Sequence, residues 1–88
     1  MLRITPVTLP AGQPCLFLEG RLLGPWVHEL AGTVAAASDS PAGLQLDLTG
    51  VHYVDAQGLA LLRSLQGRGA VLRAVSPFVA ELLHERPT

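Results

Sequence analysis

Charge is scarce in this sequence. Asp, Glu, Lys and Arg together make up 15% of the 88 residues, and lysine is absent. The formal net charge is −1, so no basic surface for nucleic acid is expected. The single cysteine, Cys15, excludes an internal disulfide and a cysteine-based metal cluster. No apolar run approaches the roughly 20 residues that a membrane-spanning helix needs, so we expect no direct membrane insertion.

Hydrophobic residues, by contrast, make up 49% of the chain, which is typical of a globular protein. A chain of this length has room for one hydrophobic core, so we expect a single domain over residues 1–88. The N-terminal stretch is interrupted by Thr5 and Pro6 and therefore has no signal-peptide core. These features together predict a cytoplasmic protein.

The N-terminal part of the chain predicts an antiparallel β-hairpin. Apolar and polar residues alternate over 2–8, which indicates a strand, and Pro6 places this strand at a sheet edge because proline cannot donate to a β-ladder. Turn residues follow over 9–14. The apolar run 15–20 then predicts a second strand that is buried on both faces.

Helices and strands alternate after the hairpin. The predicted elements are a helix from Pro25 that ends before 38–43, a strand over 44–48, a helix from the N-cap Asp55 to about Gln66, a strand over 70–75, and a helix with Ser76 as N-cap and Pro77 as its first residue. The order β-β-α-β-α-β-α predicts an α/β fold with a small four-stranded mixed sheet flanked by three helices. Residues 51–54 are left open, either as a strand or as an irregular link.

Apolar residues at helical spacing predict the buried faces of the three helices. These residues are Leu23, Trp26, Val27, Leu30 and Val34 in the first helix, Gly58, Leu61, Leu62 and Leu65 in the second, and Phe78, Val79, Leu82 and Leu83 in the third. Cys15 lies in an apolar strand and is predicted to be a core residue, since free cysteine behaves as a small hydrophobe. Gly58 either packs closely against a strand or receives a partner, and packing is the favoured interpretation.

The stretch YVDAQGLALL, residues 53–62, lies where a functional surface is expected. Open sheets with parallel strands bind partners beyond the carboxyl ends of those strands, and the strand 44–48 leads towards Asp55 at that edge. The free backbone N–H groups of a helix start favour a capping side chain and also favour a bound partner. Asp55 is therefore predicted to cap the helix, and a partner contact there is compatible with capping.

The sequence shows no catalytic or metal-binding pattern. The three histidines, His28, His52 and His84, are far apart and have no metal-ligand spacing. Cys15 has no activating base beside it in the sequence. We therefore expect no enzymatic activity, no metal site and no cofactor.

Residues 44–83 resemble the STAS domain of anti-sigma factor antagonists. In that family a strand ends in Asp-Leu-Ser, and after a short hydrophobic link Asp-Ser-Ser/Thr-Gly-Leu begins a helix. Here these motifs are Asp47-Leu48-Thr49 and Asp55-Ala56-Gln57-Gly58-Leu59. The stretch LEGRLLGPWVHEL, residues 18–30, resembles the second strand and first helix of the family more loosely. The family fold, a small sheet flanked by helices, matches the predicted order of elements.

The resemblance implies a non-enzymatic signalling domain in bacterial transcription regulation. In the family, a partner serine kinase that is also the anti-sigma factor phosphorylates the hydroxyl directly after the motif's aspartate, and the unphosphorylated form binds that kinase. The matching residue here is Ala56, which has no hydroxyl, and Gln57 carries no charge. The phosphorylation switch cannot operate at this position, so a permanently binding-competent surface is expected. The resemblance implies these partner-binding residues: Asp47, Thr49, Asp55, Ala56, Gln57 and Gly58.

Two alternatives to the anti-sigma factor antagonist remain open. The stretch VDAQGLALL is also similar to the accessory STAS subunits of membrane lipid-transport ATPase complexes, several of which have a small residue shortly after the motif's aspartate. The partner would then be a membrane-associated ATPase. The other alternative is a nucleotide-binding STAS module, which rests on family analogy alone. A homodimer is also left open.

Overall fold

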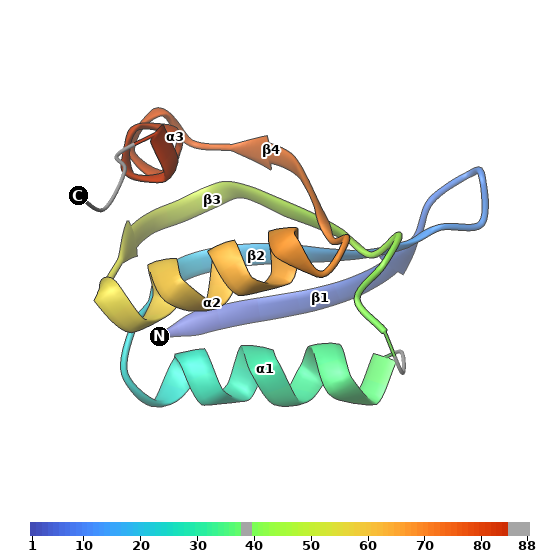
Figure 1. Cartoon of the computed structure of the whole chain (residues 1–88), viewed down its shortest axis with the longest axis horizontal. Coiled ribbons are helices and arrows are strands. Elements are labelled where there is room, and N and C mark those ends of the chain that lie inside the picture. Colours follow the sequence, from blue (N-terminus) through green and yellow to red (C-terminus); the bar gives the residue numbers. More distant parts are fainter. Residues whose placement is uncertain (38–39, 85–88) are drawn as a thin grey trace.

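The computed structural model of the chain describes residues 1–37 and 40–84 and has the predicted order of elements (Figure 1). The strands are β1 (Leu2–Thr8), β2 (Pro14–Leu22), β3 (Gln45–Val54) and β4 (Val71–Val75), and the helices are α1 (Pro25–Ala37), α2 (Ala56–Gly67) and α3 (Pro77–His84). The sheet order is β1-β2-β3-β4, with β1 antiparallel to β2 and the other neighbours parallel. The predicted mixed sheet is confirmed, and Pro6 lies in the edge strand β1.

Helices α1 and α2 lie side by side over one face of the sheet (Figure 1). On the opposite face, which no helix within residues 1–37 and 40–84 covers, exposed polar side chains lie on neighbouring strands: Thr5, Glu19, Thr49 and Arg73. The prediction that residues 15–20 are buried on both faces is therefore wrong. The strand is buried towards the helices through Leu16 and Leu18, whereas Phe17 is half-buried and Glu19 is exposed.

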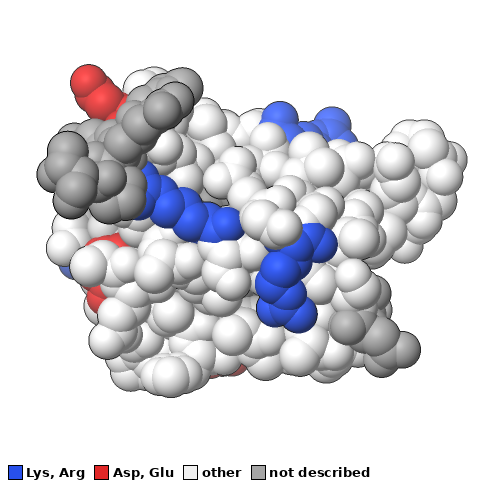
Figure 2. Space-filling model, viewed as in Figure 1, with Lys and Arg blue, Asp and Glu red and all other residues white. Residues whose placement is uncertain are grey.

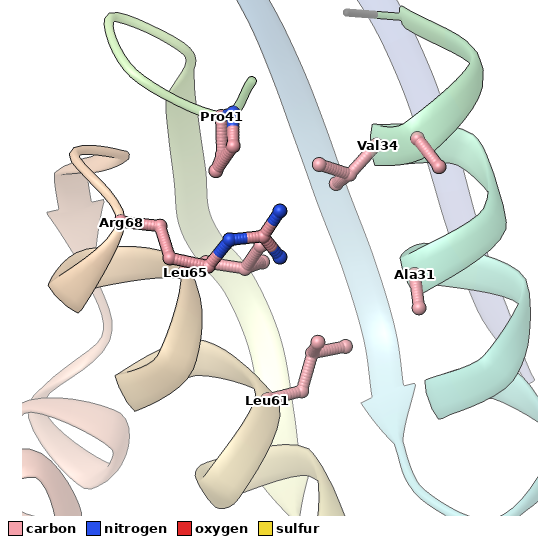
Figure 3. Close-up of a pocket in the computed structure, with 7 residues that line it drawn as sticks. Ala31, Val34, Pro41, Leu61, Leu65 and Arg68 are labelled. Carbon is pink, nitrogen blue, oxygen red and sulfur yellow. The ribbon is translucent and has the colours of Figure 1, made fainter. Parts of the chain in front are cut away.

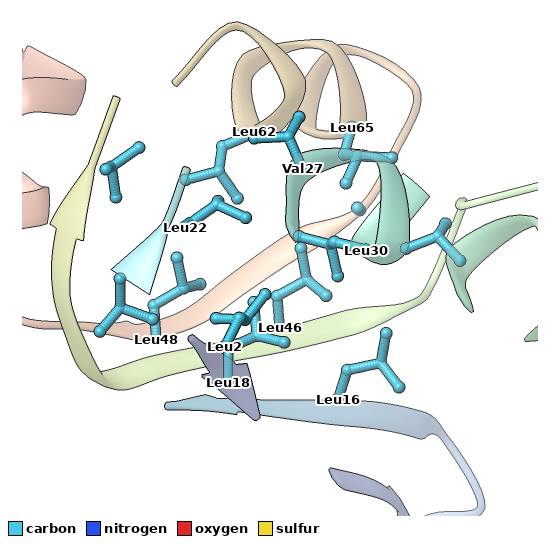
Figure 4. Packing of buried hydrophobic residues seen from close by; sticks show 14 of the residues in the cluster. Leu2, Leu16, Leu18, Leu22, Val27, Leu30, Leu46, Leu48, Leu62 and Leu65 are labelled. Atoms are coloured by element: carbon cyan, nitrogen blue, oxygen red, sulfur yellow. The ribbon is translucent and has the colours of Figure 1, made fainter. Parts of the chain in front are cut away.

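Leucine side chains from the sheet and from the two helices fill the space between these layers (Figure 4). The predicted buried faces of α1 and α2 are confirmed by Val27, Leu30, Leu62 and Leu65, which are all buried. Val34 and Gly58 are buried as well. Leu23, which lies in the loop before α1, is partly buried, and so are Trp26 and Leu61, which pack against the core. Cys15 is also buried, but it lies outside this main cluster.

Helix α3 lies beside β3, beyond the point where β4 ends (Figure 1). Its N-cap Ser76 was predicted, and the Ser76 Oγ accepts from the Val79 amide at 3.4 Å and donates to the Val51 carbonyl at 2.9 Å. Val79 is fully buried as predicted. Phe78 was predicted to be buried and is 44% exposed, because its ring stacks against Tyr53 at the surface instead of entering the core.

Strand β3 continues through Val54, which resolves the open question about residues 51–54. Its register with β2 shifts twice, and each shift inserts one extra residue into β3. An inserted residue reverses the alternation of side chains between the two faces of a sheet. The buried residues Leu48, Val51 and Val54 are consequently three positions apart. The two insertions therefore let β3 keep a buried side chain in the core at every third position as far as Val54, directly before Asp55.

Candidate functional site

Asp55 joins the start of α2 to the loop that precedes α1. Its Oδ1 accepts from the Gly58 amide at 2.7 Å, and its Oδ2 accepts from the Gly24 amide at 3.0 Å. Its own amide donates to the Leu22 carbonyl at 3.1 Å. The predicted N-cap is confirmed, and the bond to Gly24, 31 residues away in the sequence, is an addition that local sequence reasoning missed. The amides of Gly58 and then Gly24 hold the pKa of Asp55 below its ordinary value, because they stabilise the charged carboxylate.

Gly58 lets α2 approach the end of β2 closely. A Cβ atom at this position would lie 2.7 Å from the Leu22 carbonyl oxygen and 3.0 Å from Cγ1 of Val54. A distance of 2.7 Å is shorter than real Cβ contacts, so any side chain here would push the helix away from the sheet. The favoured interpretation of Gly58 as a packing residue is confirmed. Its role in partner binding stays a prediction.

Ala56 and Gln57 form the exposed surface of the first turn of α2. Both oxygens of Asp55 accept backbone amides, so these two neutral side chains largely set the chemical character of the turn. The first turn contains no acidic residue, and Ala60, one turn further along, is also exposed and neutral. The exposed helix start is therefore small and uncharged, and residue 56 offers no hydroxyl.

Asp47 and Thr49 lie further back along β3, on the sheet face opposite α1 and α2. The Asp47 Oδ1 accepts from the Thr49 amide at 3.0 Å, next to the first insertion in β3. Both residues line a shallow groove of ≈ 540 Å³ together with Thr5, Phe17, Leu18, Glu19 and Gly50. The six predicted partner-binding residues thus divide between this groove and the α2 start. Partner binding at either place stays a prediction.

An exposed aromatic pair lies at the same carboxyl edge as Asp55. The rings of Tyr53 and Phe78 are stacked, with centroids 6.4 Å apart and an interplanar angle of 17°. Tyr53 also lines a hollow of ≈ 410 Å³ with Arg21, Leu23 and His52. Sequence reasoning missed this surface because it depends on the insertions in β3 and on the position of α3. The available signal was the proximity of Tyr53 to the Asp55 motif.

A second hollow lies between α1 and α2, at the opposite end of α2 from Asp55. It has a volume of ≈ 270 Å³, and its lining is apolar apart from Arg68: Ala31, Val34, Ala35, Pro41, Leu61, Leu65 and Arg68. In Figure 3 the side chains of Leu61 and Arg68 extend from the α2 side towards α1. Figure 2 shows that the face carrying α1 and α2 is mostly uncharged, with arginine side chains near α2.

Comparison with known proteins identifies the family. A protein-family model described as "Mlab, STAS domain" matches residues 7–85, which is most of the chain. This chain belongs to the STAS domain family. The crystal structure of an antisigma-factor antagonist, a STAS domain from Rhodobacter sphaeroides, is similar to it with a TM-score of 0.58 and 17% sequence identity, over 94% of this chain and 95% of that chain. No curated protein sequence matches significantly.

The structural likeness at this identity concerns the fold, so the chemistry of this STAS domain has to be taken from its own residues. Among residues 1–37 and 40–84, no group of three His, Cys, Asp or Glu side chains is arranged to hold a metal ion. No helix within the same described ranges is long and apolar enough to cross a membrane. What the STAS motif provides is a well-anchored helix start with a small, neutral outer surface.

Proposed function

We propose that this STAS domain is a non-enzymatic regulatory subunit that binds a protein partner through the first turn of α2, without a phosphorylation switch at residue 56. The leading candidate for the partner is an anti-sigma factor of the serine-kinase type, as for an anti-sigma factor antagonist. Control would then come from the abundance of the domain or from another protein.

The observation that carries this proposal is the arrangement around Asp55. Its two oxygens accept the Gly58 and Gly24 amides, so the aspartate fixes the position of the helix start. Ala56 and Gln57 remain exposed and uncharged at that fixed position. A phosphate at residue 56 would add roughly −1.5 to −2 charges to the turn, and alanine cannot carry one. The domain therefore stays in the equivalent of the unphosphorylated, binding-competent state.

The same observation supports a second partner class. An accessory STAS subunit of a membrane lipid-transport ATPase complex has no need of a phosphoacceptor at this position, so the absence of a hydroxyl at Ala56 suits that role as well. The docking surface would be the same turn of α2, and the partner would be a membrane-associated ATPase. The two hypotheses differ in the partner and agree on the site.

The experiment is an affinity capture from lysate of the source cells, membranes included, with mass spectrometry of the retained proteins. The baits are the native chain, Ala56→Asp and Ala11→Asp. Ala56→Asp places a negative charge where the family carries its phosphate. Ala11→Asp is the matched control, since Ala11 is exposed in the β1–β2 turn, far from the start of α2.

The proposal expects one protein to be retained by the native and Ala11→Asp baits and lost from the Ala56→Asp bait. A kinase-like anti-sigma factor supports the leading partner class, and a membrane ATPase supports the second. Equal retention of the same protein by all three baits contradicts the site. Retention of no protein by the native bait contradicts the proposed function itself.

A further inference from the structure

The stacked pair of Tyr53 and Phe78 is a large apolar feature at the surface of a small protein. The two side chains are 46% and 44% exposed, and they are two of the four large hydrophobic residues that the described ranges expose to this degree. Offset aromatic pairs bury part of each ring and leave a rigid edge for other contacts. Aromatic residues of this kind are enriched among the residues that contribute most to protein interfaces.

A hollow beside the pair extends this surface towards the α2 start. It has a volume of ≈ 410 Å³ and is lined by Arg21, Leu23, His52 and Tyr53. Leu23 directly precedes Gly24, whose amide donates to Asp55. The hollow and the first turn of α2 are therefore adjacent parts of the same carboxyl edge. A partner that docks on Ala56 and Gln57 can reach into the hollow without changing the fold.

The electrostatics of this edge favour a negatively charged ligand. Arg21 is exposed, and within the described ranges it has no ion-pair partner, although Glu19 lies two residues before it. The first turns of α1, α2 and α3 contain no acidic residue, and the N-terminus of each helix carries partial positive charge. The Asp55 carboxylate at the start of α2 already accepts two backbone amides.

We infer that Arg21, Leu23, His52, Tyr53 and Phe78 form an anchor surface, which binds a partner segment that carries an apolar side chain next to a carboxylate. The apolar side chain fills the hollow against the Tyr53 ring, and the carboxylate pairs with the Arg21 guanidinium. This inference rests on the proposed function, because it names the chemistry of the partner that docks at the same edge of the sheet.

A random dodecapeptide library displayed on phage, selected against the purified full chain, tests this inference. The enriched peptides are then synthesised, and their affinities are measured by fluorescence anisotropy for the native chain, Arg21→Glu, Tyr53→Ser and Phe78→Ser. Arg68→Glu is the matched charge-reversal control, because Arg68 is exposed at the far end of α2. Circular dichroism melting verifies that each variant is folded.

We expect the enriched peptides to combine Asp or Glu with Leu, Phe or Trp. Tyr53→Ser removes an interface anchor and should weaken binding about 30-fold. Arg21→Glu should weaken it about fivefold and should regain affinity for a peptide whose acids are replaced by lysine. Arg68→Glu should bind like the native chain. A selection that enriches no acidic peptide, or affinities that are equal in Arg21→Glu, Tyr53→Ser and the native chain, contradict the inference.

Including Arg21→Glu and Tyr53→Ser as baits in the cell-lysate capture separates the two proposals. If the retained protein is lost from Ala56→Asp but kept by Arg21→Glu and Tyr53→Ser, the proposed function stands and the anchor surface is wrong. If the peptides bind at the anchor surface but the native bait retains no protein, the anchor surface stands and the proposed function is wrong.

Discussion

Two aspartates of the STAS motif, Asp55 and Asp47, both accept backbone amides, but they connect very different parts of the chain. Asp55 links the end of β3 to α2 and to the loop before α1, 31 residues away. Asp47 accepts from the amide two residues further on and supports a local irregularity of β3. The comparison indicates that the α2 start is held by tertiary bonds, whereas the groove around Asp47 depends on one local bond. We therefore expect the fixed docking surface at the α2 start and not in the groove around Asp47.

Gly58 gives the largest expected effect at the Asp55 end. In Gly58→Ala the new Cβ would lie 2.7 Å from the Leu22 carbonyl oxygen. We expect a loss of about 1–3 kcal/mol in the free energy of unfolding, as overpacking costs elsewhere. Gly32→Ala in α1 is the control, since nothing lies within 4 Å of the added atom, and it should stabilise by about 0.5–1 kcal/mol. Urea unfolding of both variants measures the difference, and equal stability of Gly58→Ala and the native chain would contradict the close contact.

Replacement of each aspartate by asparagine tests the comparison directly. Asp55→Asn keeps one acceptor oxygen where two are used, so either the Gly58 or the Gly24 amide loses its partner. Asp47→Asn can still accept from Thr49 through its single oxygen. We therefore expect Asp55→Asn to lower the melting temperature clearly more than Asp47→Asn. Equal losses would mean that the link to Gly24 does not hold the edge together.

The pH dependence of stability gives a smaller signal from the same carboxylate. The pKa of Asp55 is lowered from its ordinary value of 3.8 in the folded chain. Its contribution to stability is therefore complete above that value and is lost as the pH falls through the lower, folded pKa. Below about pH 4 the native chain should lose stability more steeply than Asp55→Asn. Thermal melts of both chains across this pH range provide the measurement. If the melting temperatures of the two chains fall in parallel with pH, the two amides do not lower the pKa of Asp55.

Ala56→Ser should have the smallest effect on stability, within about 0.5 kcal/mol, because residue 56 is exposed. The substitution restores the hydroxyl that the family phosphorylates. If the captured partner is a kinase, Ala56→Ser incubated with that partner and ATP should gain the mass of one phosphate, and the native chain should not. Intact-protein mass spectrometry distinguishes the two. A phosphate on the native chain, for instance at Thr49, would contradict the absence of a switch.

The sequence predicts most of this fold because its elements have strong local signals. The proline at the start of α1, the Asp55 and Ser76 caps and the helical spacing of the leucines each depend on near neighbours. The second half of β3 could not be assigned in the same way. Its buried residues Leu48, Val51 and Val54 have neither strand nor helix spacing, since two inserted residues interrupt the alternation. Such insertions depend on pairing with β2, which a single strand does not reveal.

In the candidate site, too, the local features were predictable from the sequence and the long-range contacts were not. The cap formed by Asp55 is a local feature and was predictable, whereas its bond to Gly24 depends on how β2 and β3 align. The motif also placed Asp47 and Asp55 in one predicted site. The structure puts Asp47 in the groove along β3 and Asp55 beyond the end of that strand, at the start of α2. Helical spacing also fails to predict the exposure of Phe78. Its position in the sequence fits the buried face of α3, but its ring stacks on Tyr53 at the surface instead.

The most direct test of the docking edge is nuclear magnetic resonance mapping of the isotope-labelled chain with the captured partner. We predict that amide signals shift or broaden at the start of α2 and around Arg21, Tyr53 and Phe78, and that the signals of residues around Arg68 stay unchanged. Changes concentrated instead in the groove of Thr5, Phe17 and Thr49, with the α2 start unaffected, would contradict it.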